Sequence, residues 1–376
     1  MVTEFFYPRC GGVEMHVFSI SQALLKQGCH VIVITRGDEH HQGIEYFNKQ
    51  LKVYYLPLEE MALGSIYPYC FLLIPFLRHI LISEQIQVVH YHQYTSGMFH
   101  TSVREVELLG IRTVYTDHSL MNTNQLDGIA INKVLQCSCS NVNALICVSK
   151  ADRSNLCERL EVSSIPHNLY VLPNGVNAKD FQHDFSNHPL SIRIRNQFGN
   201  GQYVTIAVLS RLVYRKGVFL LKELIDRVLS NYDSVNYVIA GGGKQECIIR
   251  ERADYWNAVC KQTRVFLLGT IEHDLVAPFL VSCGDIFLSC SLTESFNITL
   301  LEAFVSGCKL VSTNVGGVPE LFPSNCITLK SPTVNSLFEG IQEALVEIDF
   351  KHVAHPRVLD EVDKAILDSF EYNRPC

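Results

Sequence analysis

Charged residues are scarce in this sequence, and those present give no basic excess. They make up 18% of the 376 residues, and 38 acidic against 31 basic side chains give a formal net charge of -7. No general positive field could hold a nucleic-acid backbone, so we expect no nucleic-acid partner. A strongly anionic substrate would need local basic residues. Hydrophobic residues reach 47%, which excludes a disordered chain and supplies cores for about two domains.

Long uninterrupted apolar runs are also lacking. The chain reaches a proline and two glycines before any long apolar run, so we read no secretory signal peptide. The most apolar window, residues 66–82, contains two prolines and is broken by Arg78 and His79. It falls short of the ~20 clean residues that a membrane span needs. We interpret it as a buried helix pair, with an interfacial apolar helix that touches a membrane or a membrane partner as the alternative.

Clustered cysteines and two familiar motifs are missing. The fourteen cysteines are scattered, with Cys137 and Cys139 as the only close pair, which favours reduced thiols in a cytosolic setting. No G-x-G-x-x-G follows the first strand, and Gly241-Gly242-Gly243 lacks the downstream partner of a dinucleotide fingerprint, so a nicotinamide enzyme is disfavoured. No D-x-D pair is present, which is consistent with a site that uses no divalent metal.

The first half of the sequence alternates between helical and strand patterns. Apolar residues recur at steps of four, three and four after Gly12, which predicts an amphipathic helix that Gly28 ends. A further helix is predicted at 102–109, and strands at 30–35, 52–56, 87–91, 113–116, 144–148 and 170–172. Such strands separated by helical patterns indicate a parallel sheet.

The second half repeats this alternation. Strands are predicted at 203–209, 236–240, 265–268, 286–289 and 309–313, and helices at 218–229, 244–258, 273–282, 298–306 and 336–346. We therefore predict an α/β fold of two Rossmann-like, doubly wound domains with a ligand-binding cleft between them. The predicted boundaries are a first domain at 1–176, a linker at 177–200, a second domain at 201–350, and a tail at 351–376 that could cross back to the first domain.

Two glycines and three cations stand where an anion could bind. Gly11-Gly12 precedes the first helix, where backbone N–H groups and the helix N-terminus suit a pyrophosphate, although glycine pairs also open helices for steric reasons alone. Ser210-Arg211-Leu212-Val213-Tyr214-Arg215-Lys216-Gly217 follows the first strand of the second domain. Arg211 and Lys216 are candidates for neutralising a leaving diphosphate, and a solvated loop is the alternative.

Two carboxylates, Glu294 and Glu302, flank the start of a predicted helix. A carboxylate can accept hydrogen bonds from two ribose hydroxyls, while the N–H groups of the intervening turn face an anion. The alternative is that Glu294 only caps the helix and that Glu302 is merely exposed to solvent. The following turn, Gly316-Gly317-Val318-Pro319-Glu320, makes the pattern more distinctive.

Taken together, these motifs resemble those of the retaining GT-B glycosyltransferases, which use nucleotide sugars. The resemblance rests on Gly11-Gly12-Val13-Glu14, Pro173-Asn174-Gly175-Val176 at the family's hinge turn, Ser210-Arg211-Leu212 with Lys216-Gly217, the pair Glu294 and Glu302, and Gly316-Gly317-Val318-Pro319-Glu320. More narrowly, segments 4–8, 53–58, 116–120, 146–149 and 210–217 resemble the catalytic subunits of the GPI N-acetylglucosaminyltransferases. Such subunits end with a membrane anchor that is not readable here, so the sequence is a fragment or an isoform, or its lineage lacks the anchor.

The resemblance implies a function and a set of site residues. It implies a GT-B fold and transfer of N-acetylglucosamine from UDP-GlcNAc to phosphatidylinositol, with retention, without metal or cofactor, alongside membrane subunits on the cytosolic face of the endoplasmic reticulum. By position, Arg211 and Lys216 would bind the diphosphate, Glu302 the ribose, and Glu294 the transferred sugar. The remaining implied UDP-sugar contacts are Gly11, Gly12, Phe296, Asn297 and Ile298, with His118 beside the sugar and His90 and His92 as acceptor-side candidates.

The sequence is also compatible with other functions. A retaining glycosyltransferase could act on another lipid or on a polysaccharide, because donor-site motifs say little about the acceptor. A structural hydrogen bond is the simpler role for His118, since a histidine after a strand usually has that role. An inactive subunit that holds a UDP-sugar or scaffolds a complex is the third alternative.

Overall fold

The chain folds as two compact units. The computed structural model describes residues 1–7, 11–62, 65–66, 71–121, 126–198 and 203–348. The division between the units falls between Asn174 and Gly175, in the predicted hinge turn. The predicted tail at 351–376 lies outside the described residues.

The first unit is built on a mostly parallel sheet. Its strands are β1 (Ile32–Arg36), β2 (Gly43–Phe47), β3 (Leu51–Leu56), β6 (Val88–His92), β7 (Arg112–Asp117), β8 (Ala144–Cys147) and β9 (Leu169–Val171), besides a short antiparallel pair of β4 (Glu60–Ala62) and β5 (Ser65–Ile66). They pair in the orders β1-β3-β2 and β6-β7-β8-β9. Val2 bridges β1 and β6 and so joins the two groups.

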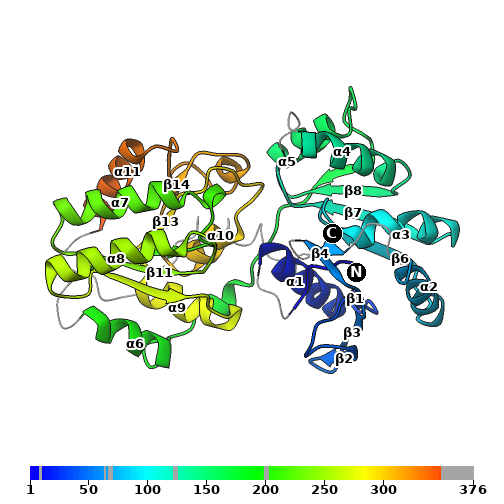
Figure 1. Cartoon of the computed structure of the whole chain (residues 1–376), viewed down its shortest axis with the longest axis horizontal. Coiled ribbons are helices and arrows are strands. Elements are labelled where there is room, and N and C mark those ends of the chain that lie inside the picture. Colours follow the sequence, from blue (N-terminus) through cyan, green and yellow to red (C-terminus); the bar gives the residue numbers. More distant parts are fainter. Residues whose placement is uncertain (8–10, 63–64, 67–70, 122–125, 199–202, 349–376) are drawn as a thin grey trace. The chain divides into compact units, whose positions relative to one another are not determined.

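Helices cover both faces of this sheet (Figure 1). They are α1 (Gly12–Lys26), α2 (Leu73–Ser83), α3 (Gly97–Leu108), α4 (Leu126–Cys139) and α5 (Lys150–Arg159). Ile32 and Ile34 pack with the core under α2, α3, α4 and α5, while Val31 and Val33 pack with Val17 of α1. This alternation is the period of two expected when both faces of a strand are buried.

The apolar window at 66–82 differs from the prediction. Its described part contains one helix, α2, and not a buried pair. Only one side of α2 is buried, although apolar residues occupy both sides of the helix. The buried side consists of Leu73, Leu77, Ile80 and Leu81, and the exposed apolar residues are Phe71, Leu72, Phe76 and Ile82. Within the described chain, no helix combines the length and apolarity needed to span a bilayer.

The second unit has a parallel six-stranded sheet in the order β12-β11-β10-β13-β14-β15. The strands are β10 (Val204–Leu209), β11 (Val235–Ala240), β12 (Val265–Gly269), β13 (Ile286–Ser289), β14 (Lys309–Thr313) and β15 (Ile327–Lys330). The helices are α6 (Pro189–Phe198), α7 (Val218–Asn231), α8 (Glu246–Cys260), α9 (Val276–Cys283), α10 (Ile298–Val305) and α11 (Val334–Glu347), with short 3₁₀ turns η1 (Ala178–Phe181), η2 (Tyr214–Lys216), η3 (His273–Leu275) and η4 (Val318–Glu320).

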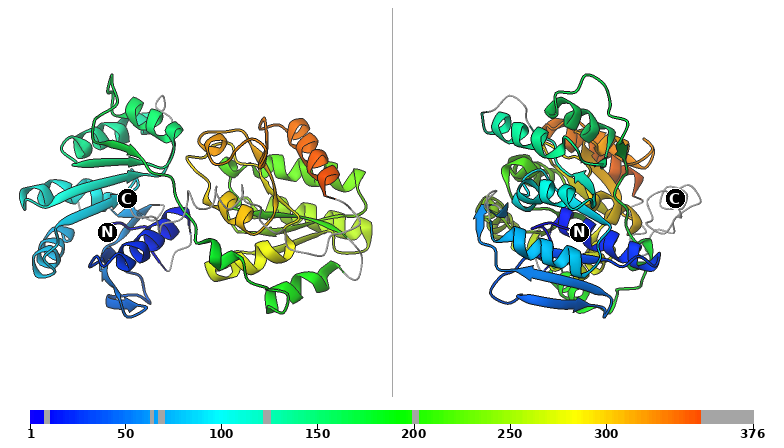
Figure 2. Two further views of the ribbon diagram at one scale, coloured as in Figure 1. Left: turned by 180° about the vertical axis from the view of Figure 1, so that it is seen from behind. Right: turned by 90° about the vertical axis from the view of Figure 1, so that its right-hand side faces the viewer.

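Two helical layers sandwich this sheet, as Figure 1 and Figure 2 show from opposite sides. Helices α7, α8 and α11 form one core with the sheet, while α9 and α10 pack with β10, β13 and β14. The segment predicted as a linker, 177–200, contains η1 and α6, and both pack against the second unit through α9. Buried Ala178, Phe181, Leu190 and Ile194 explain why this polar stretch is ordered.

Candidate active site

The candidate donor residues of the second unit lie at the carboxyl ends of β10 and β13. These two parallel strands are neighbours, and the strand order reverses between them: the chain continues from β10 to β11 on one side and from β13 to β14 on the other. Open α/β sheets bind ligands at such a point. Gly217, with φ of 73°, allows the two connections to approach: a Cβ there would lie 1.8 Å from the carbonyl oxygen of Cys290. The backbone N–H of Leu292 also donates to the carbonyl of Arg215 at 2.8 Å.

This close approach brings Lys216 and Glu294 together. Their side chains form an ion pair and are 16% and 8% exposed. The hydroxyl of Ser291 donates to the same Glu294 Oε1 at 2.7 Å. The cation expected at the diphosphate and the carboxylate expected at the sugar therefore share one site, and their charges compensate each other.

The turn that begins α10 is held in place by its backbone. The N–H of Gly317 donates to the carbonyl of Glu294 at 3.0 Å, which ties the 316–320 turn to the 294–297 turn. Asn297 takes a left-handed conformation with φ of 81°, and its Nδ2 donates to Ser289 Oγ at 3.2 Å. Phe296 is buried beneath the turn, and Ile298 is the first residue of α10. This geometry orients the helix N-terminus, where positive potential favours an anion.

Glu302 contacts a histidine that the sequence analysis did not identify. It is 5% exposed, which contradicts the alternative of a merely solvent-exposed residue. Its Oε1 lies 3.2 Å from Nε2 of His273 in η3. Burial lowers the pKa of His273, but the hydrogen bond and charge of Glu302 outweigh burial, so the pKa is raised. The contact with His273 orients the Glu302 side chain, whose oxygens can accept from hydroxyl donors.

Arg211 and the paired glycines occupy less enclosed positions. Arg211 is exposed on the loop that follows β10. Gly11 is the N-cap of α1 in the first unit, and a Cβ at Gly11 would meet Oε2 of Glu14 at 2.3 Å. Gly12 begins that helix. The carboxylate of Glu14 thus lies over the helix start where the sequence predicts an anion.

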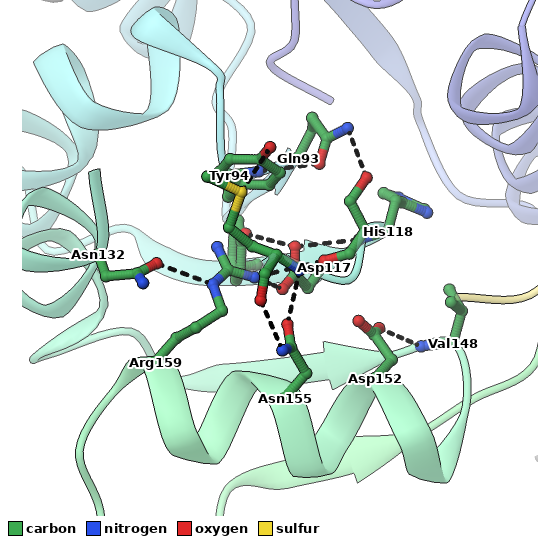
Figure 3. Close-up of polar contacts among 12 residues, drawn as sticks. Gln93, Tyr94, Asp117, His118, Asn132, Val148, Asp152, Asn155 and Arg159 are labelled. Atoms are coloured by element: carbon green, nitrogen blue, oxygen red, sulfur yellow. Dashed lines mark hydrogen bonds and ion pairs between the residues drawn. The ribbon is translucent and has the colours of Figure 1, made fainter. Parts of the chain in front are cut away.

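His118 in the first unit is positioned by a buried ion pair (Figure 3). Asp117 Oδ1 accepts the backbone N–H of His118 at 3.1 Å, and its Oδ2 accepts NH1 of Arg159 at 2.5 Å. Both ion-pair side chains are fully buried. Arg159 also donates from Nε to Asn132 at 3.0 Å and lies over the ring of Tyr94. Anchoring of this kind restricts the loop that carries His118.

Three further histidines surround His118. His92 Nδ1 lies 3.2 Å from His118 Nε2, and the ring centroid of His16 lies 4.8 Å from that of His118. His90 contacts Thr116 Oγ1 at 2.7 Å, and its ring lies 4.2 Å from that of His92. Burial is the main cause that holds the pKa of His92 and of His118 well below the usual range, so both rings are neutral.

Sequence reasoning missed Ser291, Arg159 and His273 as contacts of candidate residues. Asp117 was part of the segment 116–120 that supports His118, but its ion pair with Arg159 was not foreseen. No local pattern pointed to Arg159 or His273, because their partners lie 42 and 29 residues away in the sequence.

Comparison with known families covers both units. A family model described as Glycosyltransferase Family 4 matches residues 10–180, and one described as Glycosyl transferases group 1 matches residues 192–352. Among solved structures, sucrose-phosphate synthase from Thermosynechococcus elongatus superposes with a TM-score of 0.76 at 17% identity, covering 96% of this chain and 90% of that one. Anabaena Alr3699/HepE in complex with UDP superposes at 0.68 and 16% identity, covering 97% and 92%. These likenesses confirm the predicted GT-B fold.

Closer relatives are found among sequences. A phosphatidylinositol N-acetylglucosaminyltransferase subunit of Homo sapiens is 37% identical over 97% of this chain and 72% of its own length. The Arabidopsis thaliana protein of the same name is 37% identical over 92% and 73%. The gpi3 subunit of this transferase from Schizosaccharomyces pombe is 35% identical over 92% and 72%. The chain therefore belongs to this family of phosphatidylinositol N-acetylglucosaminyltransferase subunits, which includes gpi3, and is a GT-B glycosyltransferase.

Proposed function

We propose that this chain transfers N-acetylglucosamine from UDP-GlcNAc to phosphatidylinositol, the first step of GPI-anchor synthesis, with retention of the anomeric configuration and without a metal ion. The observation that carries the donor half is the Lys216–Glu294 ion pair at the carboxyl edge between β10 and β13. The relatives support the acceptor, because they are named as phosphatidylinositol N-acetylglucosaminyltransferase subunits.

The donor diphosphate would replace Glu294 as the partner of Lys216. Its negative charge grows as the glycosidic bond breaks, so Lys216, Arg211 and the N–H groups at the start of α10 would stabilise the departing UDP. Released from Lys216, the Glu294 carboxylate would accept hydrogen bonds from sugar hydroxyls while Ser291 keeps it oriented. Glu302, held by His273, would accept the ribose hydroxyls.

The first unit would supply the acceptor side of the reaction. We propose that Gly11 and Gly12 border the phosphates and that His118 lies beside the sugar, on the loop anchored by Asp117. Its neutral ring at neutral pH can donate or accept one hydrogen bond without adding charge. His90 and His92, which lie two residues apart on the same face of β6, would lie on the acceptor side.

We further propose that the chain works with membrane subunits on the cytosolic face of the endoplasmic reticulum. A lipid acceptor requires access to a bilayer, and the relatives are named as subunits, which supports a multi-subunit transferase. The isolated chain should therefore bind UDP yet transfer poorly to phosphatidylinositol vesicles.

The test is expression of this open reading frame in cells that lack the corresponding transferase subunit, and therefore surface GPI anchors. Restored anchors in cells with the wild-type chain, but not with Lys216→Ala, would support the proposal. Membranes from the same cells would be supplied with UDP-GlcNAc and phosphatidylinositol. Transfer to another lipid or to a polysaccharide, or UDP binding with no transfer in the presence of partner subunits, would overturn it.

A further inference from the structure

We propose that His16, His92 and His118 form a binding site for a divalent transition-metal ion of the zinc class. The three residues come from α1, from the end of β6 and from the loop after β7. One ring nitrogen from each can be chosen so that all three atoms lie within 4.8 Å of one another. No motif in the sequence groups them, since they are far apart along the chain.

The spacing of the ring nitrogens fits a tetrahedral ion. Zn–N bonds of about 2.0–2.1 Å at tetrahedral angles place two nitrogens roughly 3.3 Å apart. His92 Nδ1 and His118 Nε2 are 3.2 Å apart. A small movement of the His16 ring would make it the third protein ligand. The fourth coordination position would be left to water or another small ligand.

The environment of the three rings also suits a metal. Imidazole binds metals as the neutral ring, and all three side chains are buried at 5%, 0% and 9% exposure. The hydrogen bond between His92 Nδ1 and His118 Nε2 places one proton between two of the proposed ligand atoms, so that proton must move to the other nitrogen of its ring when a metal binds.

The contacts of the described residues leave part of this cluster unsatisfied. His92 is fully buried, and its Nε2 has no hydrogen-bond partner within the described part of the chain. A buried polar atom without a partner costs about 1–3 kcal/mol, so purely structural histidines are usually hydrogen-bonded on both nitrogens.

Binding here would oppose transfer. A metal on His118 would occupy the ring nitrogen that we assign to the sugar, so zinc is expected to inhibit the enzyme. This consequence rests on the proposed function, whereas metal binding does not. The two are separable because binding can be measured on the full chain without substrate.

The probe is Co²⁺, added to the purified full chain after treatment with a chelator. One Co²⁺ per chain should give the intense visible absorption of a four-coordinate site, and Zn²⁺ should displace it because zinc binds such ligands more tightly. Substitution of His92→Gln or His16→Gln should weaken binding by more than the 10–100-fold typical of outer-shell changes.

Two control variants test specificity. His100→Gln removes a half-buried histidine of the same unit that contacts Ser138 and the Tyr94 carbonyl outside the cluster, and His30→Gln removes an exposed one. Both should keep Co²⁺ binding. Unchanged absorption in the His92 and His16 variants, or no absorption in the wild-type chain, would overturn the proposal.

A measurement on the wild-type chain covers variants that fail to fold. The zinc-edge X-ray absorption spectrum of the loaded protein should show imidazole nitrogens at about 2.0–2.1 Å. Sulfur ligands at about 2.3 Å would assign the metal to cysteines and refute the histidine site.

Discussion

Lys216 and Glu294, separated by 78 residues in the sequence, form an ion pair between the connections that follow β10 and β13. A hydrogen bond holds the carboxylate of this pair in place, because Ser291 donates to the same oxygen of Glu294. Each charge of the pair stabilises the other. Binding of an anionic donor would exchange this internal partner for the diphosphate, so the cost of separating the pair forms part of donor affinity.

Substitution of Lys216 or Arg211 by alanine should lower turnover strongly. A charge-assisted contact to a developing anion in a dry site contributes about 2.7–4 kcal/mol, or ~10²–10³ in kcat. Arg215→Ala is the matched control, since Arg215 is an exposed cation of the same loop, and it should retain near wild-type turnover. Steady-state transfer in membranes is the measurement. Wild-type turnover in Lys216→Ala or Arg211→Ala would contradict its assigned role.

Substitution of Glu302 and of Glu294 should change different constants, donor binding in the first case and kcat in the second. Glu302→Gln removes a charged acceptor of ribose hydroxyls in ground state and transition state alike, so KM for the donor should rise and UDP should bind about 10–150-fold more weakly. Glu294→Gln should not weaken UDP binding, because it removes the internal partner that the diphosphate must displace from Lys216, and it should lower kcat, because the carboxylate would contact the sugar. Glu343→Gln, at an exposed position of α11, is the control. The idea fails if calorimetry finds equal losses of UDP affinity in the Glu294 and Glu302 variants.

Stability should depend on pH through His273. Its pKa is raised in the folded chain, so its pairing with Glu302 contributes fully below the ordinary pKa of 6.5 and is lost as pH rises through the raised value. The only tryptophan, Trp256 in α8, reports unfolding of the second unit. Urea unfolding followed by its fluorescence should show a loss of stability across this window that His273→Gln abolishes. An identical pH profile in the variant would rule out this linkage.

Chelation should not stop transfer. We expect EDTA to leave the rate unchanged, or to raise it if the histidine cluster has captured zinc, because cations of the chain and backbone N–H groups would stabilise the leaving UDP. The assay is transfer in membranes before and after chelator treatment. Loss of activity that Mg²⁺ or Mn²⁺ restores would require a bound cation in the donor site.

Asp117→Asn should destabilise the first unit. Breaking a fully buried ion pair leaves the guanidinium of Arg159 uncompensated and typically costs about 3–5 kcal/mol. The exposed pair Lys133–Glu161 provides the control, where Glu161→Gln should leave stability nearly unchanged because solvent screens the pair. Thermal unfolding measures both. A double variant, Asp117→Leu with Arg159→Met, tests the coupling. If it lost as much free energy of unfolding as Asp117→Leu and Arg159→Met lose in sum, the two side chains would not be coupled.

The sequence alone was sufficient for the alternation of helices and strands and for the fold class. Apolar spacing in α7 and the mostly apolar runs of β10 and β11 are local consequences of burial, so they can be recognised without knowing the neighbours. The strand β2 was missed: it is a short antiparallel strand at the edge of its group, and its apolar residues Ile44 and Tyr46 are exposed and do not mark a buried face. The linker prediction overlooked α6 for a similar reason, since only part of that polar segment is buried.

Only the tertiary structure decided which chemical groups meet. Periodicity tells which side of a strand faces a core, but not which strands are neighbours, so nothing local pairs Lys216 with Glu294 or Asp117 with Arg159. The sequence could indicate the residues that carry charge at the ends of strands. Strand order and the approach permitted by Gly217 placed those charges in contact, because long-range pairing depends on the whole sheet and not on any one segment.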